Sequence, residues 1–120
     1  MGQWIKVETD LESSHKVRAL MRKMGINKDE AIGLIIRFWF SVTRQKPSGI
    51  LGFSDPDRML DLLEPPPEKS KEFIAALIEV GLVDTDPLRV HDWMDYAKGY
   101  LQAKYGKNKA KYSAIEDQWA

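Results

Sequence analysis

The fold is decided by residues 27–47, which read NKDEAIGLIIRFWFSVTRQKP. Asn27 is placed to cap a helix, and Glu30, three residues on, is placed to reach back to the Asn27 amide. From Ala31 to Val42 nearly every residue is apolar. A helix that is apolar almost all round lies inside a domain rather than on its surface. We therefore expect a central helix here, ending just before Pro47, because proline disfavours helix at the residue preceding it.

Three consecutive aromatic residues, Phe38, Trp39 and Phe40, stand in the middle of this helix. Aromatic side chains bury large areas and dominate the energetics of protein cores. We expect Trp39, with its two neighbours, to form the heart of the core rather than a box for a cofactor.

On the N-terminal side, a shorter amphipathic helix is predicted over residues 14–24. Ser13 or Ser14 caps its start, and Gly25 follows its end, where glycine is common. Apolar residues recur within it at helical spacing: Val17, Leu20, Met21 and Met24. Further upstream, residues 4–7 alternate weakly, which indicates a short edge strand or an extended arm.

Downstream of the central helix, the pattern changes to shorter elements. Residues 48–53 form an apolar run bounded by glycines, which predicts a brief strand. Ser54 is placed to cap a helix that carries Met59 and ends before the three prolines at 65–67. A further helix is expected over residues 69–80.

The last third of the chain predicts a hairpin followed by a helix. Residues 82–91 are typical of a tight hairpin, with its turn at 85–87. Asp92 is placed to cap a last helix that starts at Trp93. Gly99 and Gly106 are weak points in that helix, because glycine lowers helix stability.

The order from residue 28 onward is helix, short strand, helix, helix, strand, tight turn, strand. This is the order of a winged helix-turn-helix, with residues 82–91 as the wing and residues 69–80 in the place of the recognition helix. We therefore predict a mainly α fold with a small antiparallel sheet (α+β), an extra N-terminal helix and a C-terminal helical extension. The predicted domains are a winged-helix domain over 1–95 and a basic helical extension over 96–120.

Composition is that of an ordinary globular chain of 120 residues, with 43% hydrophobic and 30% charged residues. No apolar run reaches the roughly 18 residues of a membrane helix, so no membrane partner is expected. The N-terminus lacks the apolar segment of a secretory signal, which predicts a cytoplasmic protein. Cysteine is absent, which excludes disulfides and thiolate zinc sites.

Although the formal net charge is zero, the basic residues are unevenly placed. The stretch from Glu12 to Asp29 and the stretch from Tyr96 to Tyr112 contain no acid between their ends. Lysines and arginines neutralise phosphates, and tyrosines among the C-terminal lysines could stack on unpaired bases. The candidate DNA-binding residues are Lys16, Arg18, Arg22, Lys23, Lys98, Lys104, Lys107, Lys109 and Lys111. A solvated charged surface is the alternative for either stretch.

Catalytic chemistry finds little support in the residues. The nucleophile-elbow pattern Gly-x-Ser-x-Gly is absent, and the glycines of 48–53 are not followed by the Lys-Ser/Thr of a phosphate loop. His91, Asp92 and Asp95 form the closest set of metal-ligand types, but Asp92 fits a helix cap better. We therefore expect no enzyme, no metal and no cofactor.

Several local motifs together resemble a known family. They are Trp4-Ile5-Lys6-Val7, Ala31-Ile32-Gly33-Leu34 leading to Phe38-Trp39, Ser48-Gly49-Ile50-Leu51, Ala76-Leu77-Ile78-Glu79-Val80-Gly81-Leu82-Val83 and Val90-His91-Asp92-Trp93. This succession, over roughly residues 4–100, resembles the N-terminal domains of phage and prophage replication proteins. It is also similar in layout to the N-terminal winged helix of DnaD-type primosomal initiators. The resemblance implies that this domain self-associates, while a basic extension or a later domain contacts DNA. Replication proteins are further expected partners.

Two functional hypotheses follow. In the first, the chain acts in initiating phage-type DNA replication: it self-associates and binds DNA with low sequence specificity. Low specificity is expected because residues 69–80 have zero net charge and hold no Arg, Asn or Gln to read base edges. In the second, it is a module for oligomerisation or scaffolding that does not touch DNA. The residues expected to contact a second subunit are Trp93, Met94, Tyr100 and Leu101. The alternative for these residues is that they cover the chain's own core.

Overall fold

The computed structural model describes residues 11, 13–51, 58–59, 70–85 and 87–119. Within them lie five helices and a two-stranded antiparallel sheet, so the predicted class, mainly α with a small sheet, is confirmed. The bounds are α1 His15–Met24, α2 Lys28–Gln45, α3 Ser70–Glu79, β1 Val83–Asp84, β2 Arg89–Val90, α4 Trp93–Tyr105 and α5 Lys109–Trp119. The expected arm at 4–7 and the prolines at 65–67 lie outside the described residues. Most of the helix expected between Ser54 and these prolines also lies outside the described residues. The part of it that is described is a short turn at residues 58–59.

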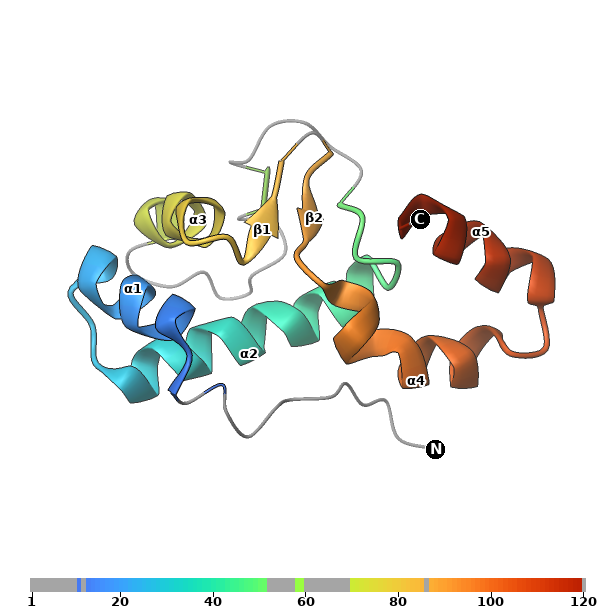
Figure 1. Cartoon of the computed structure of the whole chain (residues 1–120), viewed down its shortest axis with the longest axis horizontal. Coiled ribbons are helices and arrows are strands. Elements are labelled where there is room, and N and C mark those ends of the chain that lie inside the picture. Colours follow the sequence, from blue (N-terminus) through green and yellow to red (C-terminus); the bar gives the residue numbers. More distant parts are fainter. Residues whose placement is uncertain (1–10, 12, 52–57, 60–69, 86, 120) are drawn as a thin grey trace.

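The central helix α2 forms where the sequence predicts it. Asn27 caps α2 by accepting a hydrogen bond from the Glu30 amide at 2.9 Å. Glu30 reaches back to the side-chain amide of Asn27, also at 2.9 Å, so the two residues hold each other through their side chains. In Figure 1, α2 runs beneath α1, α3 and the sheet, and α1 packs on both α2 and α3.

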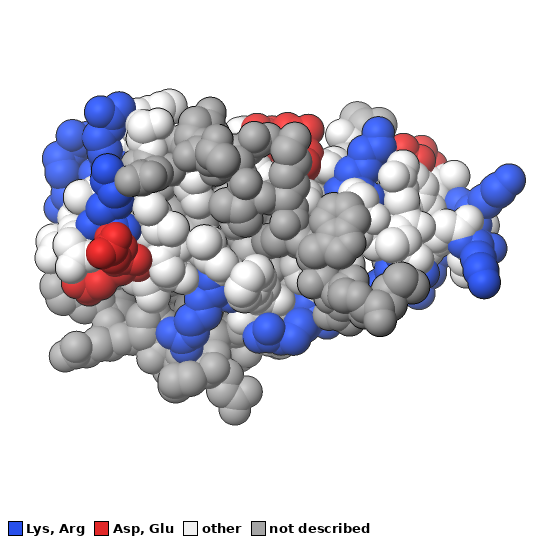
Figure 2. All heavy atoms as spheres, turned by 90° about the horizontal axis from the view of Figure 1, so that it is seen from below, with Lys and Arg blue, Asp and Glu red and all other residues white. Residues whose placement is uncertain are grey.

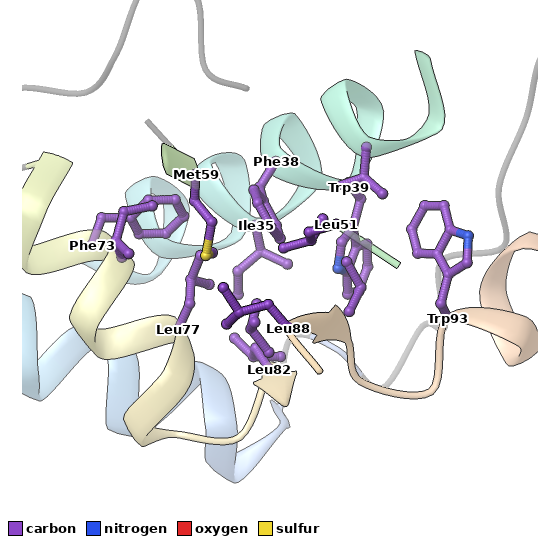
Figure 3. Packing of buried hydrophobic residues seen from close by; sticks show 14 of the residues in the cluster. Ile35, Phe38, Trp39, Leu51, Met59, Phe73, Leu77, Leu82, Leu88 and Trp93 are labelled. Atoms are coloured by element: carbon purple, nitrogen blue, oxygen red, sulfur yellow. The ribbon is translucent and has the colours of Figure 1, made fainter. Parts of the chain in front are cut away.

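The inward face of α2 carries the core. Phe38 meets Phe73 of α3 edge to face, with ring centroids 6.4 Å apart. Trp39 is 2% exposed and stacks on Tyr96 of α4 at 4.7 Å. Phe40, in contrast, is 49% exposed, so the expectation that it belongs to the core is wrong. The labelled members of the cluster in Figure 3 are Ile35, Phe38, Trp39, Leu51, Met59, Phe73, Leu77, Leu82, Leu88 and Trp93.

The hairpin forms with Val83 opposite Val90 and Asp84 opposite Arg89. The strand expected at 48–53 is reduced to a single antiparallel bridge between Ile50 and Arg89. Two backbone hydrogen bonds flank this bridge, from the Leu51 amide to Leu88 and from the Val90 amide to Gly49. The segment therefore lies along β2, on the side away from β1.

The turn between α2 and this bridge is closed by Trp93. Gly49 has φ +78°, in the left-handed region that favours glycine. A Cβ at position 49 would also overlap the ring of Trp93. The indole of Trp93 donates to the Pro47 carbonyl at 2.8 Å. This turn is thus fixed both by its backbone conformation and by the ring that covers it.

The C-terminal extension differs from the single helix that the sequence predicts. It consists of two helices, α4 and α5, which turn back on each other at residues 106–108. The expected domain boundary between residues 95 and 96 falls within α4. Asp92 precedes α4 but does not cap it through its side chain, because the residue adopts a left-handed conformation, with φ 55°. The Asn108 side chain accepts a hydrogen bond from the Lys111 amide at 3.1 Å and thereby supports the start of α5.

Candidate nucleic-acid interface

Two of the basic residues of α1 are bonded to the end of α3, and two others are exposed to solvent. Ser14 caps α1 by accepting from the Lys16 amide at 3.2 Å. The Lys16 ammonium donates to the carbonyl of Gly81, just past α3, at 2.9 Å, and Lys23 forms an ion pair with Glu79 of α3. Two of the predicted cations thus tie α1 to the end of α3. Arg18 and Arg22 are exposed, and neither pairs with another residue within the described part of the chain.

The second group of cations lies at residues 104–111, which we call the α4–α5 tip. Figure 2 shows a cluster of basic side chains at that end of the molecule. Because the chain turns at 106–108, lysines that could not share one helical face are brought to one end. The exposed lysines of the tip are Lys104, Lys107, Lys109 and Lys111. Lys98 is also exposed, further back on α4.

Two lysines of the tip contact tyrosines. Lys104 donates to the Tyr100 hydroxyl at 3.2 Å, and this hydrogen bond raises the pKa of Lys104 above its ordinary value. The Lys111 ammonium lies 5.0 Å from the centre of the Tyr105 ring, a favourable cation–π arrangement. The raised pKa keeps the Lys104 ammonium protonated at neutral pH.

The C-terminal tyrosines are used within the fold and not displayed for base stacking. Tyr100 is 4% exposed. Tyr96 stacks on Trp39, and Tyr105 already has Lys104 and Lys111 near its ring. Tyr112 is half-buried. Tyr96 and Tyr100 therefore serve in packing, and the expectation that they stack on unpaired bases does not fit this conformation.

The two basic groups lie far apart. The molecule measures 44 × 31 × 26 Å, with α1 near one end of the long axis and the α4–α5 tip at the other. Each strand of a DNA duplex carries one phosphate per about 3.4 Å of helix axis, so each group meets a different part of any bound DNA. The basic surface is divided into two patches.

The helix α3 presents a surface of mixed charge. Its exposed side chains in the described structure include Lys71, Glu72, Ala75 and Glu79, and Glu79 is held by Lys23. Reading base edges in the major groove relies on bidentate donors such as Arg, Asn and Gln. The surface of α3 displays no such side chain among its described residues.

Three of the four residues expected at a subunit interface lie inside the chain's own core. Trp93 and Leu101 are fully buried, and Tyr100 nearly so. Met94 alone of the four is partly exposed. The structure favours the alternative, in which this side of α4 covers its own domain and is not offered to a second subunit.

A charged network occupies the hairpin. His91 lies between two carboxylates, with Nδ1 3.0 Å from Asp84 and Nε2 3.3 Å from Asp92. Arg89 is 3.5 Å from the same Asp84 carboxylate and covers the ring of Trp119 at 4.7 Å. Within the described residues, no group of three His, Asp or Glu side chains is arranged to hold a metal ion. The network links the β1–β2 hairpin to the last turn of α5.

A cleft of about 450 Å³ opens beside the start of α1. Its walls combine polar and basic groups of α1 with the Trp39–Tyr96 stack: Leu11, Ser13, Ser14, His15, Lys16, Arg18, Trp39 and Tyr96. Trp39 is almost fully buried and Lys16 is held by Gly81, so these two side chains have little to offer a ligand in the cleft.

Sequence reasoning missed the exposed position of Phe40. Helical spacing carried the signal, since Arg37 and Arg44 stand three residues before and four residues after it. Residues at these spacings share one face of a helix. An aromatic residue between two arginines marks the outward face of α2.

Comparison with models of protein families, with curated proteins and with solved structures finds no match for this chain. In the part of the chain that the structure describes, every helix is too short or too polar to cross a membrane.

Proposed function

We propose that this chain is a non-enzymatic, cytoplasmic winged-helix domain that binds DNA with low sequence specificity, of the type that acts in phage or prophage replication initiation. The order of elements supports this fold: α2, the bridge at Ile50, α3, then the hairpin β1–β2. In a winged helix the first strand pairs with the third, and Ile50 pairs with Arg89 of β2 in that manner.

The observation that carries the DNA proposal is the α4–α5 tip. Four lysines are gathered there by the turn at 106–108, and all are exposed. The chain holds no acidic residue between Asp95 and Glu116, so nothing along this segment neutralises them. Such a surface contacts phosphates and releases counterions irrespective of base sequence.

The surface of α3 supports low specificity. A helix that displays Lys71, Glu72 and Ala75 supplies neither net charge nor bidentate donors toward the major groove. The proposal therefore assigns the affinity to backbone contacts, and changes of DNA sequence should alter it little.

The test is fluorescence anisotropy with two unrelated duplexes at low and moderate salt. If about four or five phosphates are neutralised, the slope of log K against log salt is near −4, and raising salt from about 50 to 200 mM weakens binding roughly 250-fold. Changing Lys98, Lys104, Lys107, Lys109 and Lys111 to Gln should flatten the slope equally for both duplexes. Lys71→Gln on α3 is the control and should have a much smaller effect. Wild-type protein that binds neither duplex at low salt would exclude the DNA role.

The second candidate is a protein-interaction module that self-associates or docks a replication protein. The mixed charge of the exposed α3 surface favours it, because such surfaces pair with complementary protein surfaces. Sedimentation velocity over a wide concentration range tests self-association. If Met94, the partly exposed residue of the predicted interface, contributes, Met94→Glu should shift the profile towards monomer. A wild-type chain that stays monomeric at high concentration excludes self-association.

A further inference from the structure

Phe40 is the large apolar side chain that the described part of the molecule leaves exposed, at 49%. Its neighbours Phe38 and Trp39 are buried at 1% and 2%. Phe40 therefore contributes little to the core of the chain. About half of the surface of Phe40 is in contact with water and can be reached by another molecule.

Two arginines flank this ring along α2. Arg37 and Arg44 precede and follow Phe40 by three and four residues, spacings that place side chains on one helix face. The guanidinium of Arg44 lies 3.4 Å from the Ser41 hydroxyl. Arg37 is half-buried and one of its amino groups is closed off from solvent, so the remaining part of its guanidinium is what it offers to a phosphate; Arg37 forms no ion pair with the described residues. Neither positive charge is matched by a carboxylate there.

The surrounding sequence reinforces the positive charge. Between Glu30 and Asp55 the chain holds no acidic residue. Over the seven residues from Arg37 to Arg44 the helix rises about 10.5 Å. A base stacked on Phe40 would thus have its flanking phosphates directed towards one arginine on each side.

Charge decides between the two occupants that this face could take. In a symmetric contact with a second copy, each patch meets itself, which would bring the arginines of both copies together around Phe40. A nucleic acid offers a π face and negative charge together. In a duplex both faces of a base are already stacked, so an unpaired base is required.

We propose that Phe40, Arg37 and Arg44 form a stacking platform for single-stranded nucleic acid on the outward face of α2. This rests on the proposed function and adds to it a preference for unpaired strands. The platform is separate in sequence from the α4–α5 tip, so the two surfaces can be tested independently.

The experiment compares a single-stranded oligonucleotide with an abasic strand of equal length, which keeps the phosphates and lacks the bases. Wild-type protein should bind the base-containing strand about 5- to 140-fold more tightly, the range that one stacked base supplies. Phe40→Ala should abolish this ratio and leave affinity for duplex DNA unchanged. Phe40→Tyr keeps the ring and should keep the ratio, whereas Phe40→Leu keeps apolar bulk and should lose it.

The outcomes separate this platform from the tip. If Phe40→Ala retains the wild-type ratio while the lysine-to-Gln variant of the tip loses duplex binding, the platform is wrong and the proposed function stands. If wild-type protein binds no DNA of any form, both fail. If wild-type protein sediments as a dimer and Phe40→Ala as a monomer with its preference for bases unchanged, the face belongs to a second copy and the platform is excluded.

Discussion

The two basic ends of the molecule use their cations in different ways. At the α1 end, Lys16 and Lys23 are held by groups at the end of α3. At the α4–α5 tip, Lys107 and Lys109 are exposed and contact no partner in the described structure. Both stretches look alike in the sequence, as acid-free runs of lysine and arginine. The comparison teaches that a count of cations overestimates the charge that a surface offers to DNA.

The largest effect on stability is expected at Trp39, which lies beside elements of both ends of the molecule. Trp39 stacks on Tyr96 of α4 and also lines the cleft beside α1. Trp39→Ala should lower the free energy of unfolding by about 3–5 kcal/mol, because it leaves a large cavity. Chemical denaturation measures this. The neighbouring Phe40→Ala is the control, with a much smaller expected change because Phe40 is half-exposed, and equal losses for the two variants would contradict the placement of both rings.

Removing equal charge from each end tests the comparison directly. The double variant Lys107→Gln/Lys109→Gln should make the slope of log K against log salt shallower by about 2, one for each lost phosphate contact. The double variant Lys16→Gln/Lys23→Gln should leave the slope unchanged, because those ammonium groups are already bonded to the protein. Anisotropy titrations at several salt concentrations measure both. Equal changes in slope would show that the bonds of Lys16 and Lys23 within the protein do not keep these side chains from contacting DNA.

Loss of the anchor of α5 should have an intermediate effect. The indole of Trp119 donates to the Ser48 carbonyl at 2.8 Å, and Arg89 covers its ring. Trp119→Ala should cost about 1–2 kcal/mol, from one hydrogen bond and one cation–π contact. Hydrogen exchange should rise over residues 109–119. Gln118→Ala, an exposed neighbour, should leave exchange as it is, and protected amides in Trp119→Ala would show that α5 is held by other contacts.

The smallest effects concern the internal bonds of α1. Lys16→Met removes the hydrogen bond to Gly81 and should cost about 1 kcal/mol. Lys23→Gln removes an exposed ion pair with Glu79 and should cost about 0.2–1 kcal/mol, less at high salt. Thermal melts at two salt concentrations separate the two. If the loss of stability in Lys16→Met depended strongly on salt and that in Lys23→Gln did not, Lys16 and not Lys23 would be the residue that acts through an exposed ion pair.

The elements with strong local signals could be predicted from the sequence. The central helix has a cap at Asn27 and a proline at its end, and α1 has Ser14 and Gly25 at its two ends. These signals act within a few residues, so tertiary structure does not override them. The hairpin at 82–91 formed for the same reason.

The faces of these elements were harder to predict. Because α2 is apolar almost all round, the spacing of Arg37 and Arg44 is the one local sign that Phe40 points outward, and three consecutive aromatic residues obscure it. The turn at 106–108 depends on Asn108 restarting a helix and on Trp119 reaching Ser48, 71 residues away in sequence. Likewise, Asp92 is turned away from the cap position and towards His91. Contacts between residues far apart in the sequence, such as Trp119 with Ser48, are set by packing and leave no pattern in the local sequence.

The contact between Gly49 and Trp93 restricts the order in which this sequence could change. Since a Cβ at position 49 would overlap the ring, any side chain there is excluded while the tryptophan remains. A smaller residue must replace Trp93 first, and this replacement removes the hydrogen bond that the indole donates to the Pro47 carbonyl. The two positions are therefore epistatic, and an evolving lineage would reach an altered pair through a destabilised intermediate.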